Sequence, residues 1–129
     1  MSRRVKAWAK AKRESLLMAL GERCAACGAT EDLTFDCVRP AGHKHHAWST
    51  DKRITFYCRQ AALRNLQVLC ADCNSVKGDF PPQVWSVAVA VARRAVLEAA
   101  SNSSHGRGIA SIQAATREEI RNALRAFTP

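Results

Sequence analysis

Apolar residues near the start of the chain recur at intervals that suit one face of a helix, and basic residues occupy most of the positions between them. The residues that form this stripe are Val5, Trp8, Leu16, Leu17 and Leu20. Gly21 is a typical C-terminal stop, because glycine accepts the left-handed backbone that often ends a helix. We therefore expect a basic helix over residues 1–20.

Shorter patterns follow in the middle of the chain. Leu33–Val38 alternates β-branched and aromatic residues, which predicts a strand. Asn65–Leu69 predicts a second short strand or a turn, and Asp72–Lys77 the first turns of a helix. Residues 43–60 are polar, basic and rich in histidine, so we expect a loop or loose hairpin there, with a strand at Ile54–Tyr57.

The last third of the chain predicts helices. Pro82 suits the first turn of a helix over residues 82–100, which is rich in Val and Ala on most sides. Residues 101–108 form a linker of Ser, Asn and Gly. The final helix is expected from about Thr116, which has capping-box spacing with Glu119. The 82–100 helix either packs within the chain, the arrangement we expect, or forms a homodimer; the protein is thus a monomer or a dimer through this helix.

With 129 residues, the chain has the length of one ordinary domain. We expect a single α+β domain, in which residues 21–80 form the core and residues 81–129 a helical extension. No run approaches the ~20 apolar residues of a membrane span, so we expect no membrane association. The basic, helical start does not resemble a secretion signal, and the six cysteines then fit a reducing intracellular compartment.

The most specific motif is a pair of Cys-x-x-Cys sequences. Two such pairs supply four thiolates, which satisfy a tetrahedral zinc ion and leave no open position for water. The expected zinc ligands are Cys24, Cys27, Cys70 and Cys73. Such a closed site is structural, so any catalysis must occur elsewhere. The alternatives are a redox dithiol or buried cysteines without a metal; Cys37 and Cys58, outside the pairs, are expected to be free thiols.

The formal net charge is +9, and the positive residues gather within residues 3–13 and 37–71. Clustered positive charge favours binding to a polyanion, through its phosphates more than its bases. The alternative is a basic surface that serves only solubility.

Together these elements resemble the HNH, or His-Me finger, endonuclease family in its zinc-knuckle form. The family pattern has Cys-x-x-Cys-Gly, a strand ending in Asp-His before a turn with Pro and Gly, then Asn-Leu, then Leu-Cys-x-x-Cys-Asn/His-x-x-Lys. The matching segments here are Cys24–Gly28, Asp36–Pro40, Asn65–Leu69 and Cys70–Gly78. The resemblance covers residues 21–80 and implies a ββα-metal core.

The resemblance implies metal-dependent hydrolysis of DNA phosphodiester bonds. By position, Asp36 and Asn74 would bind a catalytic Mg²⁺ or Mn²⁺, and Asn65 would brace the loop that aims the general base. The expected DNA contacts are Arg3, Arg4, Lys6, Lys10, Arg39, Lys44, Lys52, Arg53 and Lys77. Because small proteins of this family occur in phage genomes, the resemblance also implies the cytoplasm of a bacterial or phage-infected cell.

The chain departs from the family at the catalytic histidine, whose position is taken by Cys37. An imidazole titrates near pH ~6.5 and suits general-base work, whereas an ordinary thiol titrates near ~8.5. Three explanations stay open. The chain is an inactive relative that still binds DNA or serves regulation; or His43, His45 or His46 supplies the base; or Cys37 is an engineered replacement.

Overall fold

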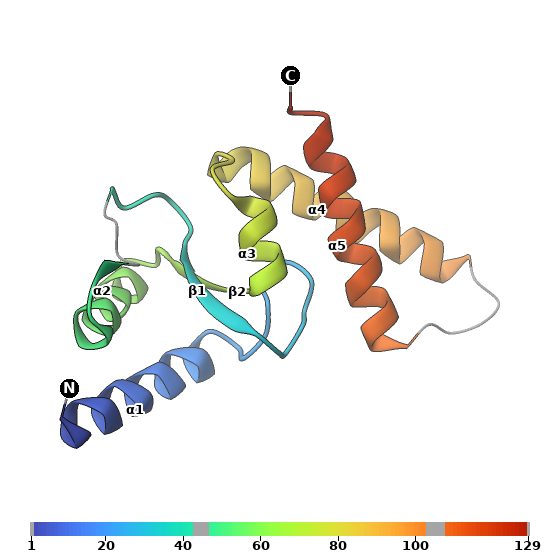
Figure 1. Cartoon of the computed structure of the whole chain (residues 1–129). Coiled ribbons are helices and arrows are strands. Elements are labelled where there is room, and N and C mark those ends of the chain that lie inside the picture. Colours follow the sequence, from blue (N-terminus) through green and yellow to red (C-terminus); the bar gives the residue numbers. More distant parts are fainter. Residues whose placement is uncertain (1, 43–46, 103–107, 129) are drawn as a thin grey trace.

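The computed structural model describes residues 2–42, 47–102 and 108–128 (Figure 1). Within these ranges the chain forms one two-stranded sheet and several helices, a mixed architecture consistent with the expected α+β class. In order, the elements are α1 (Arg3–Ala19), β1 (Leu33–Cys37), α2 (Thr50–Ala62), β2 (Leu66–Cys70), α3 (Ala71–Lys77), α4 (Pro82–Ser101) and α5 (Ile109–Arg125).

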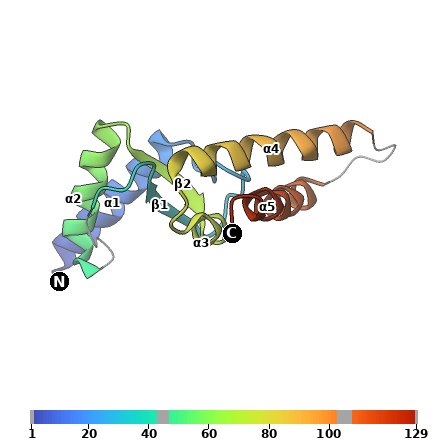
Figure 2. The same cartoon turned by 90° about the horizontal axis from the view of Figure 1, so that it is seen from above.

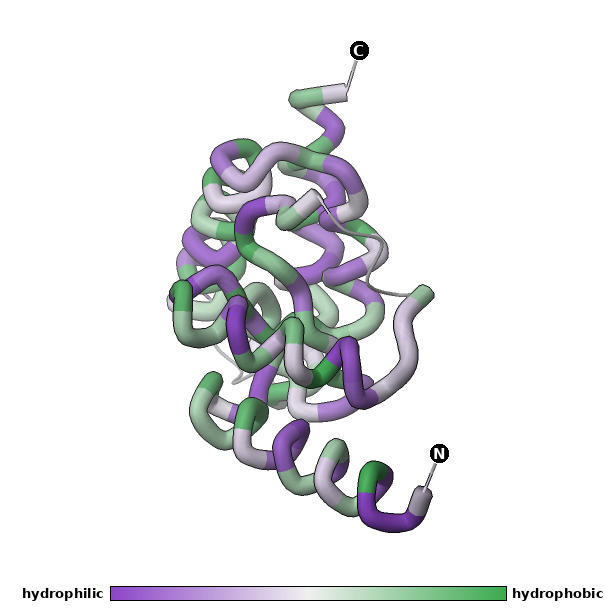
Figure 3. The backbone as a smooth tube through the Cα atoms, turned by 90° about the vertical axis from the view of Figure 1, so that its left-hand side faces the viewer, coloured by the Kyte–Doolittle hydropathy of each residue, from purple (hydrophilic) through white to green (hydrophobic). Residues whose placement is uncertain are grey.

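The N-terminal helix α1 is confirmed. Ser2 caps its N-terminus: the Ser2 side-chain oxygen accepts a hydrogen bond from the backbone N–H of Val5 at 3.2 Å. Figure 3 shows hydrophilic and hydrophobic residues alternating along this helix near the N-terminus. Only Ala9 and Leu16 of α1 are buried, so one narrow face of the helix contacts the core and the basic residues lie outside.

The sheet joins the two strands in antiparallel register, with Leu33 opposite Cys70 and Cys37 opposite Leu66. Asn65–Leu69 therefore contains a strand rather than only a turn. α3 follows β2 without an intervening loop, so β1, β2 and α3 form a compact ββα unit. Side chains alternate between the two faces of a strand, and Phe35 and Cys37 lie in the core that α1 and α2 cover.

The expected loop, hairpin or strand within residues 43–60 is wrong for its described part, because Thr50–Ala62 forms the helix α2. Ile54 and Tyr57 lie three residues apart and are both buried, as one face of a helix requires. The ring of Tyr57 lies 5.2 Å from that of Phe35. β-branched and aromatic residues therefore serve here to attach α2 to the sheet.

The C-terminal helices pack against each other and extend beside the ββα unit, on the side away from α1 and α2 (Figures 1 and 2). The α4 prediction is confirmed, but α5 begins at Ile109 and not near Thr116. Thr116 lies inside α5, where its hydroxyl donates a 2.8 Å hydrogen bond to the carbonyl of Ile112. The predicted capping box is therefore wrong.

Helix α4 places its small and aromatic residues inward. Its buried residues are Trp85, Ala88, Ala92 and Val96. Val87, Val91 and Leu97 stay more than half exposed. Trp85, Ala88 and Ala92 pack in the same cluster as Ile120 and Leu124 of α5 and the four cysteines. No helix in the described residues is both long and apolar enough to cross a membrane.

Candidate functional site

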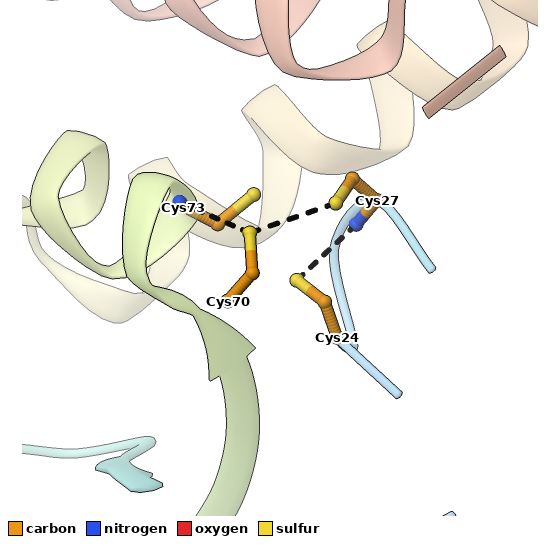
Figure 4. A group of neighbouring side chains, drawn as sticks. All are labelled: Cys24, Cys27, Cys70 and Cys73. Atoms are coloured by element: carbon orange, nitrogen blue, oxygen red, sulfur yellow. Dashed lines mark hydrogen bonds between the residues drawn. The ribbon is translucent and has the colours of Figure 1, made fainter. Parts of the chain in front are cut away.

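Four cysteine side chains from two distant segments meet between the sheet and the C-terminal helices (Figure 4). All four Sγ atoms lie within 4.8 Å of one another. They belong to Cys24, Cys27, Cys70 and Cys73, as the spacing predicted.

The measured sulfur separation fits a tetrahedral metal centre. The Sγ atoms of Cys27 and Cys70 lie 3.7 Å apart. Ligands about 2.3 Å from a tetrahedral zinc ion lie about 3.8 Å from one another, whereas a disulfide bond is about 2.05 Å long. The cysteines are all free thiols rather than disulfides. The donor set and its geometry therefore suit a metal such as zinc.

The backbone around each pair directs N–H groups at sulfur. The N–H of Cys27 donates to Cys24 Sγ at 3.5 Å, and the N–H of Cys73 donates to Cys70 Sγ at 3.4 Å (Figure 4). Gly28 follows the first pair at φ 82°, a conformation that glycine adopts without strain. These donors stabilise negative charge on the sulfurs, which is the form that binds a metal.

Ionisation of one thiol in the cluster opposes ionisation of its neighbours. Hydrogen bonds from Cys27 and Cys73 lower the pKa of Cys24, whereas the hydrogen bond to Cys24 raises the pKa of Cys73. Burial raises the pKa of Cys70. One thiolate is thus stabilised at the expense of its neighbours. A bound divalent cation would supply the charge that lets all four lose their protons.

Two side chains of helix α5 contact the first cysteine pair, and the spacing of the cysteines did not predict them. Arg117 Nη1 lies 3.4 Å from Cys27 Sγ, and this hydrogen bond raises the pKa of the guanidinium. Gln113 Nε2 donates to the carbonyl of Gly28 at 3.1 Å. The two side chains join α5 to the first cysteine pair, and Arg117 also offsets part of the thiolate charge. Arg117 and Gln113 lie one helical turn apart and so share a face of α5, but their spacing alone does not indicate which segment they contact.

A polar network lies between α3 and the sheet, separate from the cysteines. Lys77 Nζ lies 3.0 Å from Asp36 Oδ2, and Gln67 Nε2 donates to the same oxygen at 3.0 Å. Asn74 Nδ2 donates to Thr34 Oγ1 at 2.8 Å. Thr34 and Asp36 are two residues apart on β1, so they share the face that α3 covers. The network thus brings Asp36 and Asn74 to the same side of the ββα unit.

The oxygen donors of this network partly fit a hard divalent cation. Within the described residues, the hydrogen bond and ion pair to Asp36 both use Oδ2, and the bond from Asn74 uses its nitrogen. One carboxylate oxygen and one amide oxygen remain, a donor type that suits Mg²⁺ or Mn²⁺. The described residues gather three or more candidate ligands only at the cysteines. Water and phosphate would therefore have to complete the coordination at Asp36.

Cys37, at the position of the family's histidine, is only 7% exposed and belongs to the core. Burial raises the pKa of its thiol, and the nearby Asp36 raises it further. A buried, protonated thiol is poorly suited to remove a proton from water. His43, His45 and His46, the other candidates for the base, lie outside the described residues.

Asn65 bridges to the segment that follows Cys37. Its Oδ1 accepts a hydrogen bond from the N–H of Arg39 at 2.7 Å, and its Nδ2 donates to the carbonyl of Arg39 at 3.0 Å. Asn65 is 6% exposed, so these bonds are shielded from water. The side chain therefore fixes the chain just after β1.

The expected DNA contacts differ in exposure. Six of them are exposed: Arg3, Arg4, Lys6, Lys10, Arg39 and Lys52. Arg53 is half-buried, and Lys44 lies outside the described residues. Lys77 is the exception, because it is 6% exposed and paired with Asp36. Its role as a DNA contact stays a prediction, and in this arrangement its ammonium is buried against Asp36 rather than exposed.

No protein-family model matches the chain, and neither the curated proteins nor the solved structures contain a match.

Proposed function

We propose that the chain is a zinc-stabilised, metal-dependent DNA endonuclease of the HNH type. The observation that carries the proposal is that Asp36 on β1 and Asn74 on α3 belong to the network between these two elements. In the contacts among the described residues, Asp36 bonds through Oδ2 and Asn74 through its side-chain nitrogen. A domain that only bound DNA would have no need for such a pair of oxygen donors.

In this proposal the two metal centres do different work. The cysteine centre joins the two Cys-x-x-Cys segments and packs against helices α4 and α5. It takes no part in the chemistry, because four cysteine ligands leave no open position for water or substrate on the zinc ion. Asp36 and Asn74 would hold Mg²⁺ or Mn²⁺, which stabilises charge on the scissile phosphate and on the leaving oxygen. Asn65 supports the adjacent segment after β1.

The exposed basic residues would hold the DNA backbone against this site. Four of them, Arg3, Arg4, Lys6 and Lys10, lie on α1. Helix α1 contacts α2, which carries Lys52 and Arg53. Such contacts are made with phosphates, so they give affinity and register rather than sequence preference.

A second candidate is a catalytically inactive, HNH-like protein that binds DNA or regulates another factor. Two observations favour it: the thiol of Cys37 is buried, and Lys77 already neutralises Asp36. A lost general base typically lowers the rate by ~10²–10⁴-fold.

Cleavage of supercoiled plasmid separates the two candidates. The chain and its Cys37→His variant are incubated with Mg²⁺, Mn²⁺ or EDTA, and zinc content is measured afterwards to exclude loss of the fold. Metal-dependent nicking or linearisation by the chain supports the endonuclease. Activity in Cys37→His alone identifies an inactive, binding form, and no activity in either protein contradicts the endonuclease proposal. Nicked product is expected of a monomer, and linear product of a dimer.

A further inference from the structure

A cavity of about 270 Å³ lies among α1, β1, α2 and α3. Its polar lining residues are Arg13, Thr34, Thr50, Arg53, Tyr57 and Asn74, and the remaining lining residues are apolar. Among the lining residues that the structure describes, none is acidic, and the charged ones are the two arginines. The cavity therefore carries a positive charge of two against an apolar wall, which favours an anion.

Both guanidinium groups are held in place by the fold. Arg13 Nη2 donates to the carbonyl of Leu33 at 2.9 Å, and its guanidinium lies 5.4 Å from the centre of the Phe35 ring. Arg53 Nη2 donates to the carbonyl of Trp48 at 3.0 Å. A guanidinium has five N–H donors in a rigid plane, so the same group can bond to the fold and to an anion.

The two arginines of the cavity both act electrostatically on the hydroxyl of Tyr57. Burial raises the pKa of the Tyr57 hydroxyl, and the positive charges of Arg53 and Arg13 partly oppose the rise. The hydroxyl therefore lies within electrostatic range of both guanidinium groups, although they come from α2 and α1.

The size and lining of the cavity suit a phosphate with an attached sugar. The volume is much larger than the share of one water molecule, about 30 Å³. Thr34, Thr50 and Tyr57 add hydroxyl groups that can donate to phosphate oxygens, while the apolar wall can contact a sugar. Asn74 lines the cavity and also belongs to the network with Asp36.

We propose that this cavity binds a backbone phosphate of a DNA strand, beside the phosphate addressed by Asp36 and Asn74. The inference rests on the proposed function, because DNA is the ligand, and it deepens it by naming a phosphate subsite. Arg13 and Arg53 hold the phosphate, and Asn74 connects the subsite to the candidate metal site.

The first test adds one negative charge to the rim. Thr50 and Thr55 are both exposed residues of α2, but only Thr50 lines the cavity. Thr50→Glu also suits the first turn of the helix, so the fold should be kept. Binding to a fluorescein-labelled DNA duplex is measured by anisotropy without added Mg²⁺ or Mn²⁺. We expect Thr50→Glu to bind about fivefold to tenfold more weakly than the control Thr55→Glu.

The second test removes the arginines and follows salt dependence. The double variant Arg13→Gln/Arg53→Gln is compared with Arg93→Gln/Arg94→Gln, which removes the same charge from exposed positions on α4. Loss of one phosphate contact should reduce the slope of log affinity against log salt concentration by about 0.9 in the cavity variant only. Circular dichroism confirms that both variants are folded.

Equal affinities of Thr50→Glu and Thr55→Glu would overturn the subsite, as would equal salt slopes in the two double variants. A loss confined to a 5′-phosphorylated duplex would also overturn it, because the cavity would then bind a terminal phosphate. The proposed function fails separately. A chain that binds DNA through the cavity but never nicks it supports the subsite and contradicts the endonuclease, whereas nicking with normal binding in all the variants contradicts the subsite alone.

Discussion

Lys77 and Asp36 form an ion pair beneath α3, with Nζ and Oδ2 3.0 Å apart and the side chains only 7% and 16% exposed. The same ammonium lies 3.5 Å from the carbonyl oxygen of Cys37. The pair therefore connects the end of α3 to the end of β1. Lys77, which the sequence suggests as a DNA contact, therefore lies within the ββα unit, where we expect it to stabilise the fold.

Replacing Lys77 tests that role. In Lys77→Met the carboxylate of Asp36 stays buried without its partner, so the free energy of unfolding should fall by about 3 kcal/mol. The measurement is chemical denaturation followed by circular dichroism. Arg94→Met is the control: its pair with Glu98 is 82% and 65% exposed, so the same change should cost less than ~1 kcal/mol. Equal losses in the two variants would contradict a structural role for Lys77.

The cysteine centre predicts that metal content and stability change together. Cys70→Ser should lower the zinc content and the melting temperature, because binding energy at a structural zinc is folding energy. Cys58→Ser, outside the cluster, should retain both. Zinc is measured by mass spectrometry of the metal and melting by calorimetry. A normal melt in Cys70→Ser would refute the structural metal.

Arg117 should tune the metal centre without being a ligand. Removing its hydrogen bond to Cys27 Sγ in Arg117→Gln should weaken zinc binding by about 10-fold to 100-fold, as outer contacts commonly do. Arg121→Gln removes a charge one turn further along α5, where the partner is Glu118, and serves as control. Competition against a chromogenic zinc chelator measures both. Unchanged affinity in Arg117→Gln would show that the contact does not matter for the metal.

Thiol reactivity distinguishes the two cysteines outside the cluster. Cys58 is half-buried, whereas Cys37 is 7% exposed and its pKa is raised by burial. Iodoacetamide in native buffer near neutral pH should therefore modify Cys58 well before Cys37, because the thiolate is the reactive form. Peptide mass spectrometry gives the order, and guanidinium-unfolded protein is the control in which the two rates become similar. Faster labelling of Cys37 would contradict its burial.

The cysteine centre could be predicted from the sequence because each pair is local and its chemistry is specific. Two Cys-x-x-Cys motifs leave few alternatives to a shared metal. The side chains that surround the centre were not predictable in the same way. Arg117 reaches Cys27 across most of the length of the chain, and only packing of α5 decides that contact.

Helix α2 includes the segment Ile54–Tyr57, for which the residue types predicted a strand. Its Ile-Thr-Phe-Tyr segment has the residue types of a strand, and β propensity reflects packing on a pleated surface more than a backbone preference. Ile54, Tyr57 and Ala61 do recur at helical spacing, and Asp51 lies in the first turn. The start of α5 was predicted too late, because the Ser, Asn and Gly residues just before it are typical of a linker. Ile109 and Ile112 begin the helical pattern that continues to Ile120.

The burial of Lys77 could not be predicted from the sequence. A lysine in a basic chain is expected at the surface. Lys77 of α3 is buried here beside Asp36, a residue of β1 that lies far from it in the sequence. That pairing is a property of the tertiary fold.

The endonuclease proposal is tested most directly by plasmid nicking with Asn74→Ala beside Asn122→Ala, an exposed change on α5. Asn74→Ala removes one proposed metal donor and leaves the Lys77 pair with Asp36 intact. The account predicts Mg²⁺- or Mn²⁺-dependent nicking by the chain and by Asn122→Ala, and its loss in Asn74→Ala with zinc content unchanged. Undiminished nicking by Asn74→Ala, or no nicking by the chain itself, would contradict it.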